Sequence, residues 1–169
     1  QSRAEAKKLL KEAGAEGLSF ELLNRNVDQP YKYVGTWLVD EWQKIGVKVT
    51  QRMAPTGPWL DAMRRGDFDV VSAANCHGVP NPVLDIQRYL PGSVFNGNYA
   101  QFEDPDEVAL YEKMLHETDP VRQRTLMREF ERYVLDTQAH AMWIAYWYRA
   151  VPYRSYVKGW KISPSHFIN

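Results

Sequence analysis

The stretch LSFELLNRNVDQPYKYVGTWLVDEWQKIGVKVTQRMAPTGPWLDAMRRGDFDVVSAA, residues 18–74, decides the fold because two hydrophobic periods alternate along it. Leu18 to Asn24 places apolar residues at every second position, which is typical of a strand. From Tyr31 to Ile45 apolar residues recur at helical spacing, and Gly46 is suited to end that helix. Alternation then returns from Val47 to Met53 and predicts a second strand.

A second helix and a third strand complete this stretch. Pro58 stands where the first turn of a helix tolerates proline, and Gly66 marks the end of that helix. Phe68 to Ala74 is a short apolar run between turn residues, which predicts a buried strand. Strands that alternate with helices form parallel sheets with right-handed crossovers. We therefore predict an α/β fold in which a mostly parallel central sheet is flanked by helices.

The rest of the chain is mostly helical in pattern. Asp104-Pro105 and Asp119-Pro120 each place an Asp at the cap and a Pro at the first helical position. They predict helices over Asp106–Glu117 and from Asp119 to Thr137. The other predicted elements are a helix over Ser2–Gly14, a short helix over Asp85–Leu90, a strand over His140–Tyr148 and an irregular tail over Lys158–Asn169. Because neither a repeat nor a linker interrupts the pattern, residues 1–169 are predicted to form one domain.

The composition excludes several classes of protein. Hydrophobic residues make up 44% of the chain and charged residues 25%, which is typical of a globular domain. Lys plus Arg and Asp plus Glu both number 21, so the basic excess of a nucleic-acid-binding protein is missing. No apolar run approaches the ~18 residues that span a bilayer. The single Cys76 excludes an internal disulfide and a metal cluster built from cysteines.

The loops after the first and third strands are the candidate binding site. In open α/β sheets, ligands bind beyond the carboxyl ends of the strands, where the strand order reverses. If the first strand is central, the loops Asn24-Arg25-Asn26 and Asn75-Cys76-His77-Gly78 meet at that point. Both loops are polar and follow apolar strands, as a recognition site requires. The alternative is that Asn and Gly are present only because they form turns well.

Catalytic interpretations have less support in the sequence. Cys76 and His77 could form a nucleophile pair, but adjacent residues in an extended segment point to opposite faces. The four histidines lack the short spacing of a metal motif, although residues distant in sequence can still converge. They are His77, His116, His140 and His166. Glycine-rich phosphate loops, nucleophile elbows and His-Glu-x-x-His are all missing from the sequence. The sequence thus predicts a binding protein without a cofactor, with a Cys/His hydrolase as a minor alternative.

Seven short motifs, in order along the chain, resemble those of the family 5 extracellular solute-binding proteins. This family includes the dipeptide-, oligopeptide- and nickel-binding proteins of ABC importers. The matching pieces are AEAKKLLKEAG (4–14), LVDEWQKIGVKV (38–49), Trp59-Leu60 with GDFD (66–69), PNP (80–82), Asn98-Tyr99 with Asp104-Pro105, TDPVRQR (118–124) and VKGW (157–160). Each motif is weak alone, and their common order carries the resemblance.

The resemblance implies a type II periplasmic-binding fold in which two lobes close on a solute. The chain would be the C-terminal lobe, and the N-terminal lobe of the parent chain would complete the cleft. Members of the family work in the periplasm or outside the cell on a lipid anchor, and they deliver solutes to the permease subunits of an ABC importer. They are not enzymes. A ligand-sensing module that uses the same lobe is the alternative.

One departure from the family pattern bears on the solute. Peptide-binding members often carry Trp-x-Ala-Asp-Tyr after the third strand, and its Asp pairs with the α-ammonium group of the peptide. Here Asn75 stands in place of the Trp and Gly78 in place of the Asp, which favours sugars, opines or similar solutes over free peptides. The candidate contacts are Asn24, Asn75 and His77 for hydrogen bonds, Arg25 for an anionic group and Trp147 for stacking.

Overall fold

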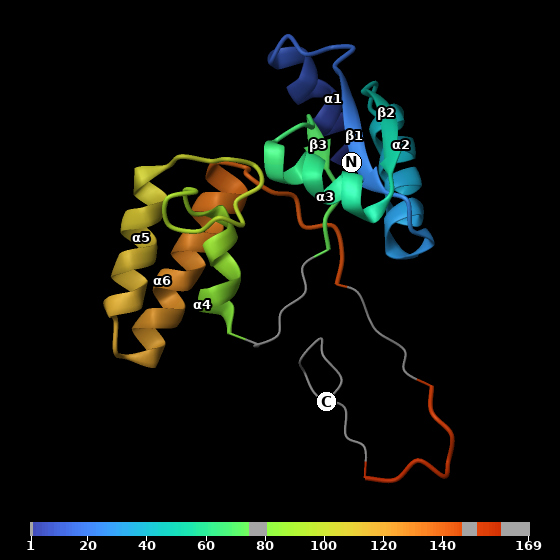
Figure 1. The fold of residues 1–169 in the computed structure, drawn as a ribbon. Coiled ribbons are helices and arrows are strands. Elements are labelled where there is room, and N and C mark those ends of the chain that lie inside the picture. Colours follow the sequence, from blue (N-terminus) through green and yellow to red (C-terminus); the bar gives the residue numbers. More distant parts are fainter. Residues whose placement is uncertain (1, 75–80, 147–151, 160–169) are drawn as a thin grey trace. The chain divides into compact units, whose positions relative to one another are not determined.

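The computed structural model describes residues 2–74, 81–146 and 152–159 of the 169-residue chain (Figure 1). The chain divides into two compact units, an N-terminal unit of residues 1–74 and a C-terminal unit of residues 75–169. The assignment of residues 1–169 to a single lobe stays a prediction. No helix in the described ranges is long and apolar enough to cross a membrane.

A three-stranded parallel sheet organises the N-terminal unit. Its strands are β1 (Ser19–Arg25), β2 (Lys48–Ala54) and β3 (Val70–Val71), in the order β2-β1-β3. The first strand is therefore central, which is the condition under which the two candidate loops meet at one edge of the sheet. Leu22 of β1 pairs with Gln51 on one side and with Val70 on the other. Leu22 and Leu23 are both completely buried although they point to opposite faces, so both faces of the sheet are covered.

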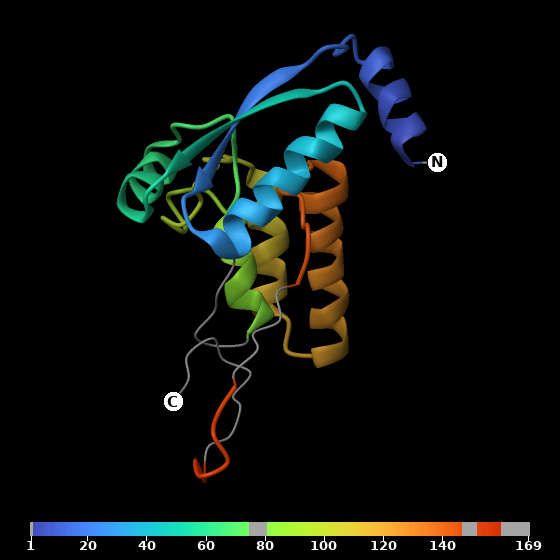
Figure 2. The same cartoon turned by 90° about the vertical axis from the view of Figure 1, so that its right-hand side faces the viewer.

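Two helices cover the two faces of this sheet. The helical segments of the unit are α1 (Ser2–Glu12), a π-helical turn at Asp28–Lys32, α2 (Tyr33–Lys44) and α3 (Thr56–Arg65). The ring of Phe20 meets that of Trp42 on α2 edge-on at 5.0 Å. Arg25 lies on the opposite face of β1 and contacts Thr56 of α3. Figure 2 shows α2 running alongside β1 and β2. The sheet is thus sandwiched between α2 and α3.

The third strand is shorter than predicted. The sequence predicts a buried strand over Phe68–Ala74, whereas β3 comprises only Val70 and Val71, both half-buried. The carboxylate of Asp69 accepts a hydrogen bond from the backbone N of Glu21 at 2.9 Å. The Asp69 carboxylate therefore takes the place of a backbone carbonyl as the acceptor for Glu21. The pairing of β3 with β1 begins one residue later, at Val70.

The C-terminal unit is helical in its described residues. Its helical segments are α4 (Pro82–Asp85), a 3-10 turn at Ile86–Tyr89, α5 (Pro105–His116), α6 (Pro120–Arg132) and a π-helical turn at Tyr133–Thr137. Asp104 and Asp119 cap α5 and α6 through side-chain hydrogen bonds to backbone N–H groups, as predicted. Helices α5 and α6 lie side by side (Figures 1 and 2). Their shared core contains Ile86, Tyr89, Leu90, Tyr111, Met114, Leu126, Phe130 and Val134.

The predicted strand over His140–Tyr148 is wrong for the residues that the structure describes. Residues 140–146 form no strand, and Met142, Trp143 and Tyr146 are exposed. A strand needs a neighbour to satisfy its backbone groups, and the C-terminal unit contains no strand in its described residues. Hydrophobic composition alone therefore misled the prediction. Residues 147 and 148 lie outside the described residues.

Candidate functional site

The carboxyl ends of β1 and β3 lie at the same edge of the sheet. The two strands are parallel, and Leu23 near the end of β1 pairs with Val71 at the end of β3. The backbone N of Ser72 also donates to the carbonyl of Leu23 at 3.0 Å, so the chain leaves both strands at one edge. The loops after the first and third strands therefore begin side by side, as the sequence predicts.

Asn24 uses its side-chain amide inside the N-terminal unit. The side chain is completely buried, and Nδ2 donates to the carbonyl of Tyr31 at 2.8 Å and to Oε1 of Gln51 at 3.1 Å. Its Oδ1 accepts from the backbone N of Arg25 at 2.9 Å. Because both donors and the acceptor have partners, Asn24 fixes the turn after β1 and thereby positions Arg25.

Arg25 is the side chain at this edge that is best placed to meet an anion. Its guanidinium group lies 5.3 Å from the ring centre of Tyr31 and 5.7 Å from that of Trp59. Nε donates to Oγ1 of Thr56 at 2.9 Å. Tyr31 and Trp59 are buried and pack edge-on at 5.6 Å, which makes a rigid support. In the described part of the chain, the terminal nitrogens of Arg25 donate no hydrogen bond, so they remain available to a carboxylate.

Sequence reasoning missed the three residues that hold Arg25, which are Tyr31, Thr56 and Trp59. A signal for two of them was present. The stretch Thr56-Gly57-Pro58-Trp59 follows the second strand directly, and parallel strands end at one edge of the sheet. Tyr31 had no such signal, because its position depends on the π-helical turn before α2.

The remaining predicted site residues cannot be placed. Asn75, Cys76, His77, Gly78 and Trp147 lie outside the described residues. In the C-terminal unit, the rings of Trp143 and Tyr146 stack with their centres 6.3 Å apart, and both are exposed.

The sequence of this chain matches the model of a known protein family. The model 'Bacterial extracellular solute-binding proteins, family 5 Middle' matches residues 1–97 of the chain. That range contains the whole N-terminal unit and more than half of the sequence. The chain belongs to this family. Family 5 proteins bind solutes and are not enzymes, which disfavours the Cys/His hydrolase interpretation.

Individual relatives agree with the family assignment. Di/tripeptide-binding protein 4 of Pseudomonas aeruginosa (strain UCBPP-PA14) is 29% identical over 165 residues, which cover 94% of this family 5 chain and 31% of the relative. The murein tripeptide-binding protein MppA of Escherichia coli matches with a TM-score of 0.73 at 20% identity, over 81% of this chain and 27% of MppA. The chain therefore spans about a third or less of each of these two relatives.

A second similar structure contains a bound solute. The protein AgaA from A. tumefaciens R10, in complex with agropinic acid, matches with a TM-score of 0.66 at 21% identity, over 79% of this chain and 28% of AgaA. These structural similarities establish the fold, an α/β lobe of the type II periplasmic-binding class. The three-stranded parallel sheet of the family 5 chain is part of that architecture.

Proposed function

We propose that this chain is one lobe of a family 5 binding protein that captures a small solute for an ABC importer. The carboxyl edge of the β2-β1-β3 sheet forms one wall of the cleft, and the N-terminal lobe of the parent protein forms the other wall. Lobe closure buries the solute and shifts an equilibrium between open and closed forms, and permease subunits recognise the closed form. The protein works in the periplasm, or outside the cell on a lipid anchor.

The observation that carries this proposal is the position of Arg25. A guanidinium group that is held over two buried rings, with free terminal nitrogens at the carboxyl edge of a parallel sheet, is suited to bind a carboxylate in a planar, two-point manner. Di- and tripeptides carry a carboxylate, and so do opine-type acids. The proteins named for such solutes among the similar chains support this class of solute.

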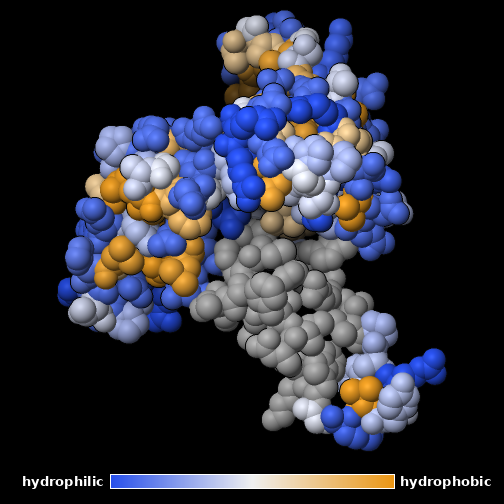
Figure 3. Space-filling view, in the orientation of Figure 1, coloured by the Kyte–Doolittle hydropathy of each residue, from blue (hydrophilic) through white to orange (hydrophobic). Residues whose placement is uncertain are grey.

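Exposed hydrophobic residues support the proposal that the chain is part of a larger protein. Hydrophobic surface is visible on both units in the view of Figure 3. Large hydrophobic side chains that are exposed in the described residues include Leu9, Trp37, Leu84, Leu115, Val121, Trp143 and Tyr146. Such residues are common at surfaces that another part of a protein covers. We assign the second lobe and the permease subunits as the partners that cover part of this surface.

The test compares solute binding in the full protein with Arg25 variants by calorimetry. We expect Arg25→Ala to weaken the binding of carboxylate-bearing solutes by about 10- to 100-fold, the size of a lost charge-assisted hydrogen bond. Arg25→Lys should also bind weakly, because an ammonium group cannot reproduce the planar fork. Arg64→Ala is the matched control, since Arg64 is exposed on α3 and pairs only loosely with Asp61 at 3.9 Å. Unchanged affinity in Arg25→Ala would refute the proposed contact.

A further inference from the structure

Three side chains that can bind a metal converge in the C-terminal unit. Asp104 caps α5, Glu107 lies in the first turn of that helix, and His140 follows the π-helical turn after α6. One ligand atom from each of the three residues can be chosen so that all lie within 4.8 Å of one another. Asp104 and Glu107 are three residues apart, which places them on the same side of the helix start. His140 comes from 33 residues further along, so tertiary folding assembles the cluster.

Glu107 is the most unusual member of the cluster. Its side chain is completely buried, and within the described part of the chain neither carboxylate oxygen has a hydrogen-bond donor. Nε2 of His140 lies 2.9 Å from Oε1 of Glu107, but the two atoms are not aligned as a hydrogen bond. A buried carboxylate without a donor is costly, and a metal ion bound directly to its oxygens would remove that cost.

The charges around Glu107 favour a cation. Burial, and next the negative charge of Asp104, raise the pKa of Glu107 to about 7. Burial also lowers the pKa of His140, which keeps the imidazole neutral and its nitrogen lone pair available. Among the described residues, no lysine or arginine pairs with Asp104 or Glu107. In the described residues the cluster therefore has two carboxyl groups, one neutral imidazole and no paired lysine or arginine.

We propose that Asp104, Glu107 and His140 bind one divalent transition-metal ion, for which Zn²⁺ is the best fit. Two carboxylates and one imidazole are common ligands of Zn²⁺, whereas Ca²⁺ and Mg²⁺ prefer oxygen ligands alone. Zinc bonds of about 2.0–2.2 Å place ligand atoms roughly 3–4 Å apart. The three ligand atoms now lie within 4.8 Å of one another, and small side-chain rotations would bring them to this shorter spacing.

Neighbouring residues already orient two of the three ligands. Tyr133 donates its hydroxyl to Oδ2 of Asp104 at 2.9 Å, and Oδ1 accepts from the backbone N of Asp106. These bonds leave further lone pairs on both oxygens for a metal. The ring of Phe102 stacks on that of His140 with their centres 3.7 Å apart. Such outer contacts are typical of metal sites because they fix the ligand geometry.

The metal would act as a structural link. It joins the start of α5 to the segment that contains His140, which forms no strand in its described residues. The three ligands belong to the C-terminal unit and Arg25 belongs to the N-terminal unit, and the proposal goes beyond solute capture and does not depend on it.

The test uses the full protein after dialysis against a chelator. Zn²⁺ is titrated by calorimetry, and Co²⁺ is added as a spectroscopic probe, since its visible absorption reports coordination by protein ligands. We expect one ion per chain, a higher Tm with Zn²⁺ and a visible Co²⁺ spectrum. Glu107→Gln and His140→Gln should each weaken metal binding by at least about 100-fold.

Two control variants separate this site from adventitious binding. Glu112→Gln and His116→Gln remove an exposed carboxylate and an exposed imidazole from the same helix, and both should bind Zn²⁺ as the parent does. Glu107→Gln removes a buried charge and keeps the shape, so it is expected to fold. The metal site is refuted if Glu107→Gln binds Zn²⁺ as tightly as the parent. It is also refuted if the parent binds no metal and Glu107→Gln only makes the protein more stable at high pH.

Discussion

Asn24 and Gly35 approach so closely that no side chain fits between them. A Cβ atom at position 35 would lie 2.1 Å from Nδ2 of Asn24 and 2.6 Å from Oε1 of Gln51. The Asn24 amide can therefore reach the carbonyl of Tyr31 only because the residue opposite it on α2 is glycine. The missing side chain at Gly35 therefore explains both the close packing of α2 on β1 and the shape of the turn that presents Arg25.

Gly35→Ala should destabilise the protein by about 1–3 kcal/mol, the usual cost of overpacking a core. The added methyl group displaces the Asn24 amide and breaks its bond to Tyr31. Gly57→Ala is the matched control, because a Cβ at position 57 meets nothing within 4 Å and alanine favours the helix there. Urea unfolding of both variants checks the prediction. Equal stability of the two variants would contradict the role given to Gly35.

Trp59 should be required for both stability and solute binding. It is 7% exposed and supports Arg25 together with Tyr31. Trp59→Ala removes a large buried side chain and should cost about 3–5 kcal/mol. Trp59→Phe should keep most of this stability, but it should weaken solute binding because the cation–π support for Arg25 is smaller. Trp37→Ala, at a 52% exposed position on α2, should have little effect in either thermal unfolding or calorimetry.

The sequence predicts the order of strands and helices along the chain and the helix caps well because their signals are local. Alternation between periods 2 and 3.6 identified β1, and Asp-Pro pairs identified the starts of α5 and α6. The prediction failed where the outcome depends on distant partners. Residues 140–146 are hydrophobic enough for a strand, but the C-terminal unit contains no strand in its described residues.

In the candidate site, too, the sequence predicts what depends on local signals and misses what depends on distant residues. The position of Arg25 at the carboxyl edge follows from the strand pattern alone, whereas the complete burial of Asn24 does not. The sequence predicts Asn24 as a ligand contact because it lies in a polar loop that follows an apolar strand. Here Gly35 opens space for its amide inside the core. The grouping of Glu107 with His140 was also hidden, since 33 residues separate them.

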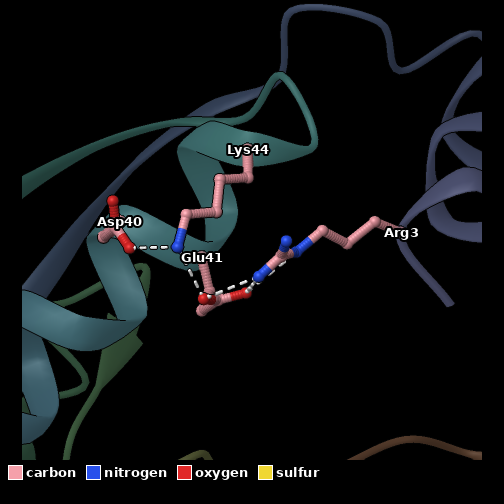
Figure 4. Close-up of polar contacts among 4 residues, drawn as sticks. All are labelled: Arg3, Asp40, Glu41 and Lys44. Carbon is pink, nitrogen blue, oxygen red and sulfur yellow. Dashed lines mark hydrogen bonds and ion pairs between the residues drawn. The ribbon is translucent and has the colours of Figure 1, made fainter.

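The ion pair between α1 and α2 should make the order of α1 depend on pH (Figure 4). Arg3 donates to both carboxylate oxygens of Glu41, and α1 contains no buried side chain. Hydrogen bonds from Lys44, and next from Arg3, hold the pKa of Glu41 below its usual value of 4.5. A lowered pKa means that the stabilisation is present above pH 4.5 and is lost as the pH falls through the pKa of the folded state.

The carboxylate signal of Glu41, followed by NMR, measures this effect. We expect its pKa to rise in both Lys44→Ala and Arg3→Ala, with the larger rise in Lys44→Ala. Only Arg3→Ala should loosen α1 at neutral pH, which hydrogen exchange of the α1 amides would report. Lys7→Ala, on the same helix, is the control. An unchanged Glu41 titration in Arg3→Ala would show that α1 is held by other contacts.

If the solute is a peptide, its carboxylate should matter more than its α-ammonium group. Gly78, which lies outside the described residues, stands where peptide-binding members of the family often carry an Asp for that ammonium group. Acetylating the amino group of a bound tripeptide should therefore change its affinity by less than about threefold. Amidating its carboxylate should weaken binding about 10-fold or more in the parent, but hardly at all in Arg25→Ala, because the partner of the carboxylate is already gone. Calorimetry with the three peptide forms decides this. Loss of binding on acetylation would instead require an acidic partner for the ammonium group.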